Sequence, residues 1–290
     1  MIRRAATDTD LAAWCEVWNA ITPREPTRAE DVKRRLEREP WRLYLVAEEA
    51  GAFVGIGFVG PTDSPGRLGL AVRVLPEMRR RGVGSQLYKQ VLGHARSRQP
   101  EWLSGVVSGA EPDSLAWAER RSFSEYGQDV ELLLRLRGDE TIPGPPTGIE
   151  IVEVTPELHA AAYALTREAW EDLPTGFAVE TPTLESWLEE DMAGPIAFAA
   201  IDDGELVGFA ALMEREAPGL LEHGLTATRR THRRRGIATA LKRTQIAWAA
   251  ANGYRELITF TQEGNEGMQA INLALGYERQ PPWIRVRRRP

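Results

Sequence analysis

The chain has 290 residues, 42% of them hydrophobic, so it is long enough for two domains that each bury a core. Its net charge of −6 argues against a general affinity for nucleic acid. The N-terminus lacks the apolar segment of a secretory signal, and no uncharged apolar run is long enough to span a bilayer. We therefore expect a cytoplasmic protein without a membrane or nucleic-acid partner.

The first half of the chain alternates strand-like and helix-like segments. Asp8 and Asp10 can cap a helix that carries Leu11 and Trp14 on one face. We expect, in chain order, a strand at 2–5, helices from 8 and at 29–38, strands at 43–48, 53–59 and 68–75, a helix at 86–95, a strand at 102–107, a helix at 113–121 and a strand at 130–136.

Residues 138–148, GDETIPGPPTG, are rich in Gly and Pro and lack an apolar period, which is typical of a linker. The order of elements then repeats, with a tight hairpin turn expected at Asp203–Gly204. The expected elements are a strand at 149–154, helices from 156 and at 183–192, strands at 196–201, 205–213 and 220–226, a helix at 240–252, a strand at 257–261 and a helix at 268–275.

The two halves also share sequence. The segment AFVGIGFV from Ala52 corresponds to ELVGFAAL from Glu205, 153 residues later. An internal repeat at a nearly constant offset indicates two copies of one domain. We therefore expect an N-terminal domain at 1–137, a linker at 138–148 and a C-terminal domain at 149–290.

A glycine turn stands between a strand and a helix in each copy. In the second copy it lies in RRTHRRRGIATAL, residues 229–241, and in the first copy in RRRGVGSQL, residues 79–87. Such a turn directs backbone N–H groups at one point near the positive end of a helix, which is a geometry that binds phosphate or pyrophosphate. Gly236 lets a ligand approach the backbone closely.

The turns match the pattern Gln/Arg-x-x-Gly-x-Gly/Ala at Arg79, Gly82 and Gly84, and at Arg233, Gly236 and Ala238. The chain thereby resembles the GCN5-related N-acetyltransferases, the GNAT family, and its element order is similar to theirs in both copies. The resemblance implies an α/β fold of two tandem domains, each with a mostly antiparallel central sheet flanked by helices. It also implies acetyl-CoA as co-substrate and an amine as acceptor.

The resemblance assigns the CoA contacts to the turns and the strands before them. In the second copy, Asn265 and the sequence Leu275–Gly276–Tyr277 resemble a further family motif that flanks the thioester. The implied CoA-binding residues are Leu225, Thr226, Ala227, Thr228, Arg233, Arg234, Arg235, Gly236, Ile237, Ala238, Thr239 and Asn265 in the second copy, and Val72, Val74, Arg79, Arg81, Gly82, Val83, Gly84 and Ser85 in the first.

Family members often carry a glutamate base eleven positions before the motif arginine. That position is Glu222 in the second copy but Leu68 in the first. His223 is an alternative base or relay on the opposite face of the strand. The tyrosine that often protonates the leaving thiolate is replaced by Asn272, and by Ala118 in the first copy. The resemblance therefore implies a catalytic second copy and leaves its general acid unassigned.

The first copy keeps its glycine turn without a base, so we expect it to be non-catalytic and able to bind CoA. The acceptor is expected near residues 171–185, beside Trp170, Asp172, Phe177 and Trp187. A non-catalytic acetyl-CoA-binding regulator is the alternative function, and a monomer or homodimer is expected. The four histidines lack metal-ligand spacing, so no metal site is predicted.

Overall fold

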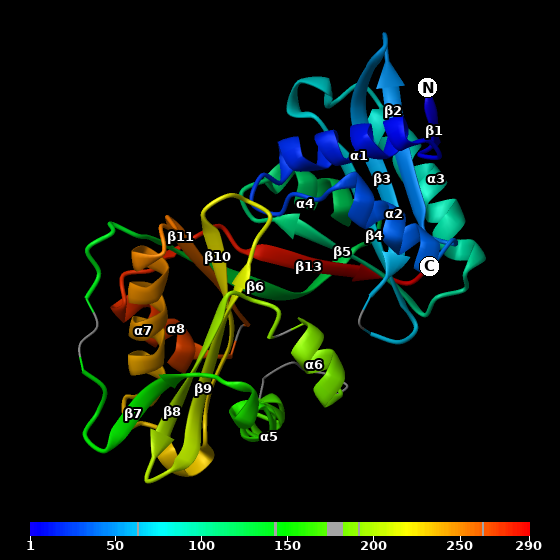
Figure 1. Cartoon of the computed structure of the whole chain (residues 1–290). Helices are drawn as coiled ribbons and strands as arrows, with labels where there is room; N and C mark the ends of the chain where they lie inside the picture. The colour runs from blue at the N-terminus through cyan, green and yellow to red at the C-terminus, as the bar shows by residue number, and fades with distance from the viewer. Residues whose placement is uncertain (63, 142–143, 173–181, 191, 263) are drawn as a thin grey trace. The chain divides into compact units, whose positions relative to one another are not determined.

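The structure, a computed structural model, describes residues 1–62, 64–141, 144–172, 182–190, 192–262 and 264–290. It shows the predicted order of elements twice along the chain (Figure 1). The chain forms two compact units: unit 1 comprises Met1–Gln128 and Trp283–Pro290, and unit 2 comprises Asp129–Pro282.

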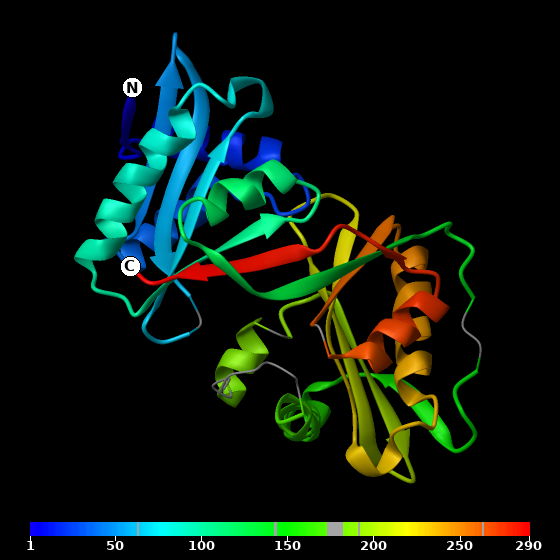
Figure 2. The ribbon, with the colours of Figure 1, turned by 180° about the vertical axis from the view of Figure 1, so that it is seen from behind.

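Unit 1 has a sheet with helices on both faces. Its strands, in spatial order, are β1 (Ile2–Arg4), β2 (Leu43–Glu49), β3 (Ala52–Pro61), β4 (Arg67–Val74), β5 (Trp102–Ser108) and β13 (Trp283–Arg288). Neighbours are antiparallel except β4 and β5, which run parallel. Helices α1 (Asp8–Ile21) and α2 (Ala29–Arg38) cover one face, and α3 (Val83–Ser97) and α4 (Pro112–Glu119) cover the other (Figures 1 and 2).

Unit 2 repeats this architecture. Its strands, in spatial order, are β6 (Ser124–Arg135), β11 (Glu256–Gln262), β10 (Leu220–Thr228), β9 (Glu205–Glu214), β8 (Ile196–Asp202) and β7 (Ile149–Glu153). Of β6, the residues from Asp129 onward belong to unit 2, and the short β12 (Glu278–Arg279) also pairs with them. Only β10 and β11 are parallel among the described pairs. Helices α5 (His159–Trp170) and α6 (Leu184–Glu190) pack on one face, and α7 (Ile237–Ala251) and α8 (Glu266–Ala274) on the other (Figure 2).

The compact units exchange the last strands of the two sequence copies. The segment of β6 from Asp129 to Arg135, which the sequence places at the end of the first copy, pairs with β11 in unit 2. Strand β13, at the end of the second copy, pairs with β5 in unit 1. The domain limits 1–137 and 149–290 were drawn from the sequence repeat alone, and they stay a prediction about the two copies.

No helix in the described part of the chain combines the length and apolarity needed to cross a bilayer.

The exchange makes the C-terminal residues part of the core of unit 1. Ile284 and Val286 on β13 are 7% and 3% exposed and pack in the same apolar cluster as Leu103 and Phe123. A chain that ends at Pro282 should therefore lose hydrophobic stabilisation of roughly 1.5–3 kcal/mol per buried side chain, together with the hydrogen bonds along β5. We expect hydrogen exchange at β5 to accelerate in this truncation.

A chain that ends at Arg288 is the matched control, because it removes only two exposed residues and should keep the protection of β5. Equal protection of β5 in both truncated chains would contradict the assignment of β13 to unit 1.

Candidate functional site

In each unit, two parallel strands separate after a short stretch of pairing. Strands β4 and β5 pair only at Arg67–Gly69 with Trp102–Ser104. Strands β10 and β11 pair only at Leu220–Glu222 with Glu256–Ile258. Beyond these residues each strand pairs only with its other neighbour, so an opening forms beside the strand that leads into the glycine turn.

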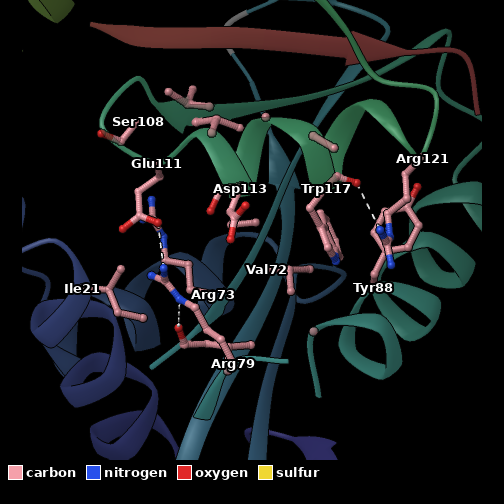
Figure 3. Close-up of a pocket in the computed structure, with 18 of the residues that line it drawn as sticks. Ile21, Val72, Arg73, Arg79, Tyr88, Ser108, Glu111, Asp113, Trp117 and Arg121 are labelled. Carbon is pink, nitrogen blue, oxygen red and sulfur yellow. Dashed lines mark hydrogen bonds and ion pairs between the residues drawn. The ribbon is translucent and has the colours of Figure 1, made fainter. Parts of the chain in front are cut away.

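Unit 1 contains a pocket of about 900 Å³ at this opening (Figure 3). Most residues that the sequence assigned to CoA binding in the first copy line it: Val72, Val74, Arg79, Gly82, Val83, Gly84 and Ser85. Arg81 is exposed and is not among the lining residues. The structure therefore brings together nearly all of the predicted contacts of the first copy.

The glycine turn of unit 1 is open toward the pocket. Gly82 has a φ of 87°, and α3 begins at the next residue. A Cβ atom on Gly82 would meet no heavy atom within 4 Å. The side chain of Arg79 closes the turn, because its Nε donates to the carbonyl of Val74 at 3.1 Å and its Nη1 pairs with Glu111 at 2.7 Å. The free space and the N-terminus of α3 fit a pyrophosphate group.

The pocket also carries aromatic residues that the sequence analysis missed. Tyr88 of α3 and Trp117 of α4 meet edge to face at 5.4 Å, and the guanidinium of Arg121 lies 3.7 Å from the centre of a Trp117 ring (Figure 3). Arg121 also donates to Ser85 Oγ at 2.9 Å. Trp117 and Arg121 are four residues apart, so the sequence could have shown that they share a helix face. Such pairs are too common on ordinary helix surfaces to indicate a binding site.

The glycine turn of unit 2 has the same backbone but other neighbours. Gly236 has a φ of 80°, and the Nε of Arg233 donates to the carbonyl of Thr228 at 3.2 Å, as Arg79 does in unit 1. A Cβ on Gly236 would lie 3.5 Å from Cγ of Pro146, which belongs to the predicted linker. Unlike a Cβ on Gly82, a Cβ on Gly236 would therefore contact another segment of its own unit.

Carboxylates neutralise the arginines around the second turn. Arg230 and Arg233 both pair with Asp172, and their hydrogen bonds lower the pKa of that carboxyl to about 2. Arg235 pairs with Asp202 at 2.8 Å, while Arg234 is exposed with a φ of 62°. A phosphate at this turn would have to share these cations with the protein's own acids.

The other predicted CoA contacts of the second copy lie along β10, α7 and α8. Leu225 and Ala227 pack in an apolar cluster with α5 and α6, whereas the hydroxyls of Thr226 and Thr228 are buried without a hydrogen-bond partner among the described residues. Ile237, Ala238 and Thr239 form the first turn of α7. Asn265 caps α8 by accepting from Met268 N at 3.4 Å.

Glu222 and His223 point to opposite faces of β10, as their adjacent positions predict. His223 contacts Gln245 of α7, with 2.9 Å between Nδ1 and Oε1, so Glu222 faces the side of α5 and α6. A register shift follows His223 in the pairing of β10 with β9. The carboxylate of Glu222 is paired with Arg215 and is only 16% exposed. It therefore lies on the face of the strand opposite His223 and is engaged by a cation of its own chain.

His223 belongs to a buried polar cluster. Its Nε2 lies against the hydroxyl of Tyr277, and burial, together with the nearby Lys242, lowers the pKa of His223 well below its usual range. Asn272 is fully buried, so it is not a helix-surface amide, and neither of its amide atoms has a hydrogen-bond partner among the described residues. A buried unsatisfied amide is costly, so a water or ligand atom that reached it would gain a hydrogen bond.

Two further sequence expectations concern the acceptor and metals. Trp187 is fully buried and packs against Tyr163 and Phe209, so it is a core residue. Phe177 lies outside the described residues. Among the residues that the structure describes, no cluster of His, Cys, Asp or Glu is arranged to hold a metal ion.

Lys242 of α7 was not singled out by the sequence, because it lies in a polar stretch of the helix with Arg243, Thr244 and Gln245. It is 1% exposed, and burial lowers its pKa to about 7 from a usual value of 10.5. Between these two pH values the unfolded chain binds a proton at Lys242 that the folded chain does not, so the contribution of Lys242 to stability should rise with pH across this window and stay constant below it.

The substitution Lys242→Met should raise the free energy of unfolding at pH 7 by on the order of a few kcal/mol and remove most of the rise between pH 7 and 10. Urea denaturation at several pH values measures both effects. Lys89→Met, on an exposed position of α3, is the control and should keep the pH profile of the parent. Parallel profiles for the parent and Lys242→Met would refute this account.

Comparisons with known proteins agree with this geometry. The model of the acetyltransferase (GNAT) family matches residues 10–123 and 162–277, one region in each copy. A mycothiol acetyltransferase from Acidothermus cellulolyticus is 27% identical over 173 residues, which cover 58% of this chain and 50% of that protein. The match thus spans about half the length of that curated relative.

Two solved structures share the fold over the whole chain. A GCN5-related N-acetyltransferase from Sphaerobacter thermophilus has a TM-score of 0.78 at 21% identity and covers 100% of this chain and 96% of its own. A tandem GNAT protein from the clavulanic acid biosynthesis pathway has a TM-score of 0.78 at 20% identity and covers 100% and 97%. The two family matches and the repeated fold lead to one conclusion: the chain is a tandem member of the acetyltransferase (GNAT) family, and so one of the acyltransferases.

Proposed function

We propose that the protein transfers the acetyl group of acetyl-CoA to a primary amine of a small molecule or peptide. The observation that carries the proposal is the pocket of unit 1, which connects an open glycine turn with the gap between β4 and β5. A pyrophosphate at the N-terminus of α3 would let the rest of CoA extend along Val72 and Val74 into that gap. The name of the curated relative favours the transfer of an acetyl group.

The reaction needs an acid–base group as well as a donor site. The amine nitrogen forms a bond to the acyl carbon, the carbon–sulfur bond breaks, and the proton of an ammonium acceptor must leave first. We assign proton removal to Glu222, because it faces the side of β10 that is opposite α7 and its glycine turn. His223 is enclosed by Gln245 and Tyr277, which favours a positioning role for it.

The two copies would then differ in their roles. The first copy has the open turn and the pocket, but Leu68 stands at the position of the base. The second copy has Glu222, the unsatisfied amide of Asn272 and a turn of the same conformation. We therefore assign CoA binding to both copies, with the tighter site in the first, and amine acetylation to the second. A regulator without turnover remains the alternative, favoured by the ion pair of Glu222 with Arg215.

The binding assignment can be tested at equivalent positions of the two turns. A Cβ on Gly84 would make ordinary van der Waals contacts with Val74 and Val72, at 3.6 and 3.9 Å, and Gly84 has no positive φ, so Gly84→Glu should place a negative charge in the first site without straining the turn. Ala238→Glu is the matched change in the second copy. Calorimetry should show that Gly84→Glu abolishes the tighter site for acetyl-CoA while Ala238→Glu leaves it intact. The reverse result would move the tighter site to the second copy.

The catalytic assignment is tested by Glu222→Gln, which keeps the shape of the side chain but removes the proton acceptor. The rate of thiol release from acetyl-CoA with a panel of amines should fall by about 10²–10⁴-fold at neutral pH. It should recover in part at high pH, where the amine loses its proton in solution. A variant as active as the parent would exclude Glu222 as the base, and an inactive parent with every amine would favour the regulator.

A further inference from the structure

One arginine of the pocket in unit 1 has no partner for its charge. Arg73 lies on β4 between Val72 and Val74 and lines the pocket. Its guanidinium makes no hydrogen bond or ion pair with any residue that the structure describes, and its Nε is buried without a partner. Two other arginines of the pocket, Arg79 and Arg121, each donate hydrogen bonds to oxygen atoms of the protein.

Arg73 points to a different face of the sheet from the glycine turn. Val72 and Val74 pack toward α3, which carries the turn at its start. Because side chains alternate along a strand, Arg73 lies on the side of α1 and α2. Figure 3 shows it at the end of the pocket beside Ile21 and Glu111, away from Tyr88 and Trp117. A phosphate bound at the turn would therefore leave this guanidinium unpaired.

The guanidinium is held by a rigid aromatic platform. It stacks on Trp18 of α1, 4.3 Å from the ring centre. Trp18 is fixed in turn, because its indole N–H donates to the carbonyl of Glu25 at 2.7 Å and its ring stacks on Trp14 at 5.2 Å. Stacking leaves the edge of a guanidinium, with its N–H donors, directed outward. The donors of Arg73 are thus preorganised for a planar acceptor.

Arg73 carries a positive charge that no carboxylate of the described residues pairs with. Burial lowers the pKa of Arg73 but an arginine stays protonated at physiological pH. Glu25 is the acid whose field reaches it, without forming an ion pair with it. The equivalent position in the second copy, 154 residues later, is Ala227, which is buried in an apolar cluster. The unpaired cation is therefore a property of the first copy and not of the shared fold.

We propose that the pocket of unit 1 recognises a carboxylate through Arg73, at the end of the pocket beside Ile21 and Glu111. The carboxylate belongs either to the acyl group of an acyl-CoA or to a second molecule bound beside CoA. A guanidinium and a carboxylate form two parallel N–H···O bonds, and such charge-assisted pairs are stronger than neutral hydrogen bonds. The inference concerns a ligand of the first copy and does not require acetyl transfer in the second.

The test is calorimetric binding to the full chain, with no turnover required. Acetyl-CoA and succinyl-CoA probe the acyl group, and glutarate and N-acetylalanine, titrated into protein saturated with CoA, probe a second ligand. We expect at least one carboxylate probe to bind, and Arg73→Met to weaken it by about 10–100-fold while acetyl-CoA affinity changes little. Tighter binding of succinyl-CoA would identify the acyl group as the source; binding of a free carboxylate would identify a second ligand.

Arg98→Met is the matched control, because Arg98 also stacks on a tryptophan of unit 1, Trp41 at 4.8 Å, but does not line the pocket. This variant should bind all probes as the parent does. The inference is overturned if no carboxylate probe binds while acetyl-CoA does, or if carboxylate binding survives Arg73→Met. Loss of acetylation activity in Glu222→Gln, or its absence in the parent, would not affect this result, so the two proposals fail separately.

Discussion

The early end of parallel pairing in each unit is the constraint on which both candidate sites depend. Strands β4 and β5 share three paired residues, and so do β10 and β11. Each partner then continues in an antiparallel ladder on its other side, which supports the separated strands without closing the gap. The unpaired edge of a strand offers N–H and C=O groups to a ligand, and in both units that strand leads into a glycine turn.

The two copies fill this common frame with different chemistry. Around the opening of unit 1 the structure has Tyr88, Val91, Ala118 and Phe123, which leave a pocket with apolar and aromatic walls. The residues 154 positions later are Lys242, Gln245, Asn272 and Tyr277, all of them buried polar groups. Buried polar groups are costly unless they are paired, and both amide atoms of Asn272 and the amide nitrogen of Gln245 have no hydrogen-bond partner among the described residues, so the second copy gives up stability at this place. That cost is understandable if the groups serve a ligand or a reaction.

The segments around each turn differ as much as the walls do. In unit 1 the turn faces open space, and in unit 2 Pro146 and the acids Asp172 and Asp202 surround it. The arginine of the motif performs the same structural task in both turns, a hydrogen bond to the carbonyl at the end of the preceding strand. Its presence in a sequence therefore indicates how the turn is built and does not by itself identify a phosphate contact.

The sequence by itself determined the repeated architecture and both turns. Local signals were sufficient there: Gly82 and Gly236 adopt the positive φ that favours glycine, and Asp203–Gly204 forms the expected hairpin turn with φ values of 49° and 80°. The alternation along β10 likewise placed Glu222 and His223 on opposite faces.

Only the tertiary structure decided which residues meet across long separations. It exchanged β13 and the end of β6 between the units, paired Glu222 with Arg215, buried Asn272, and left Arg73 on Trp18 without a partner. Hydrophobic periodicity specifies a buried face but not the element that covers it, since burial is non-directional. Strand partners, ion pairs and unpaired charges depend on that choice, so no local pattern in the chain could have fixed them.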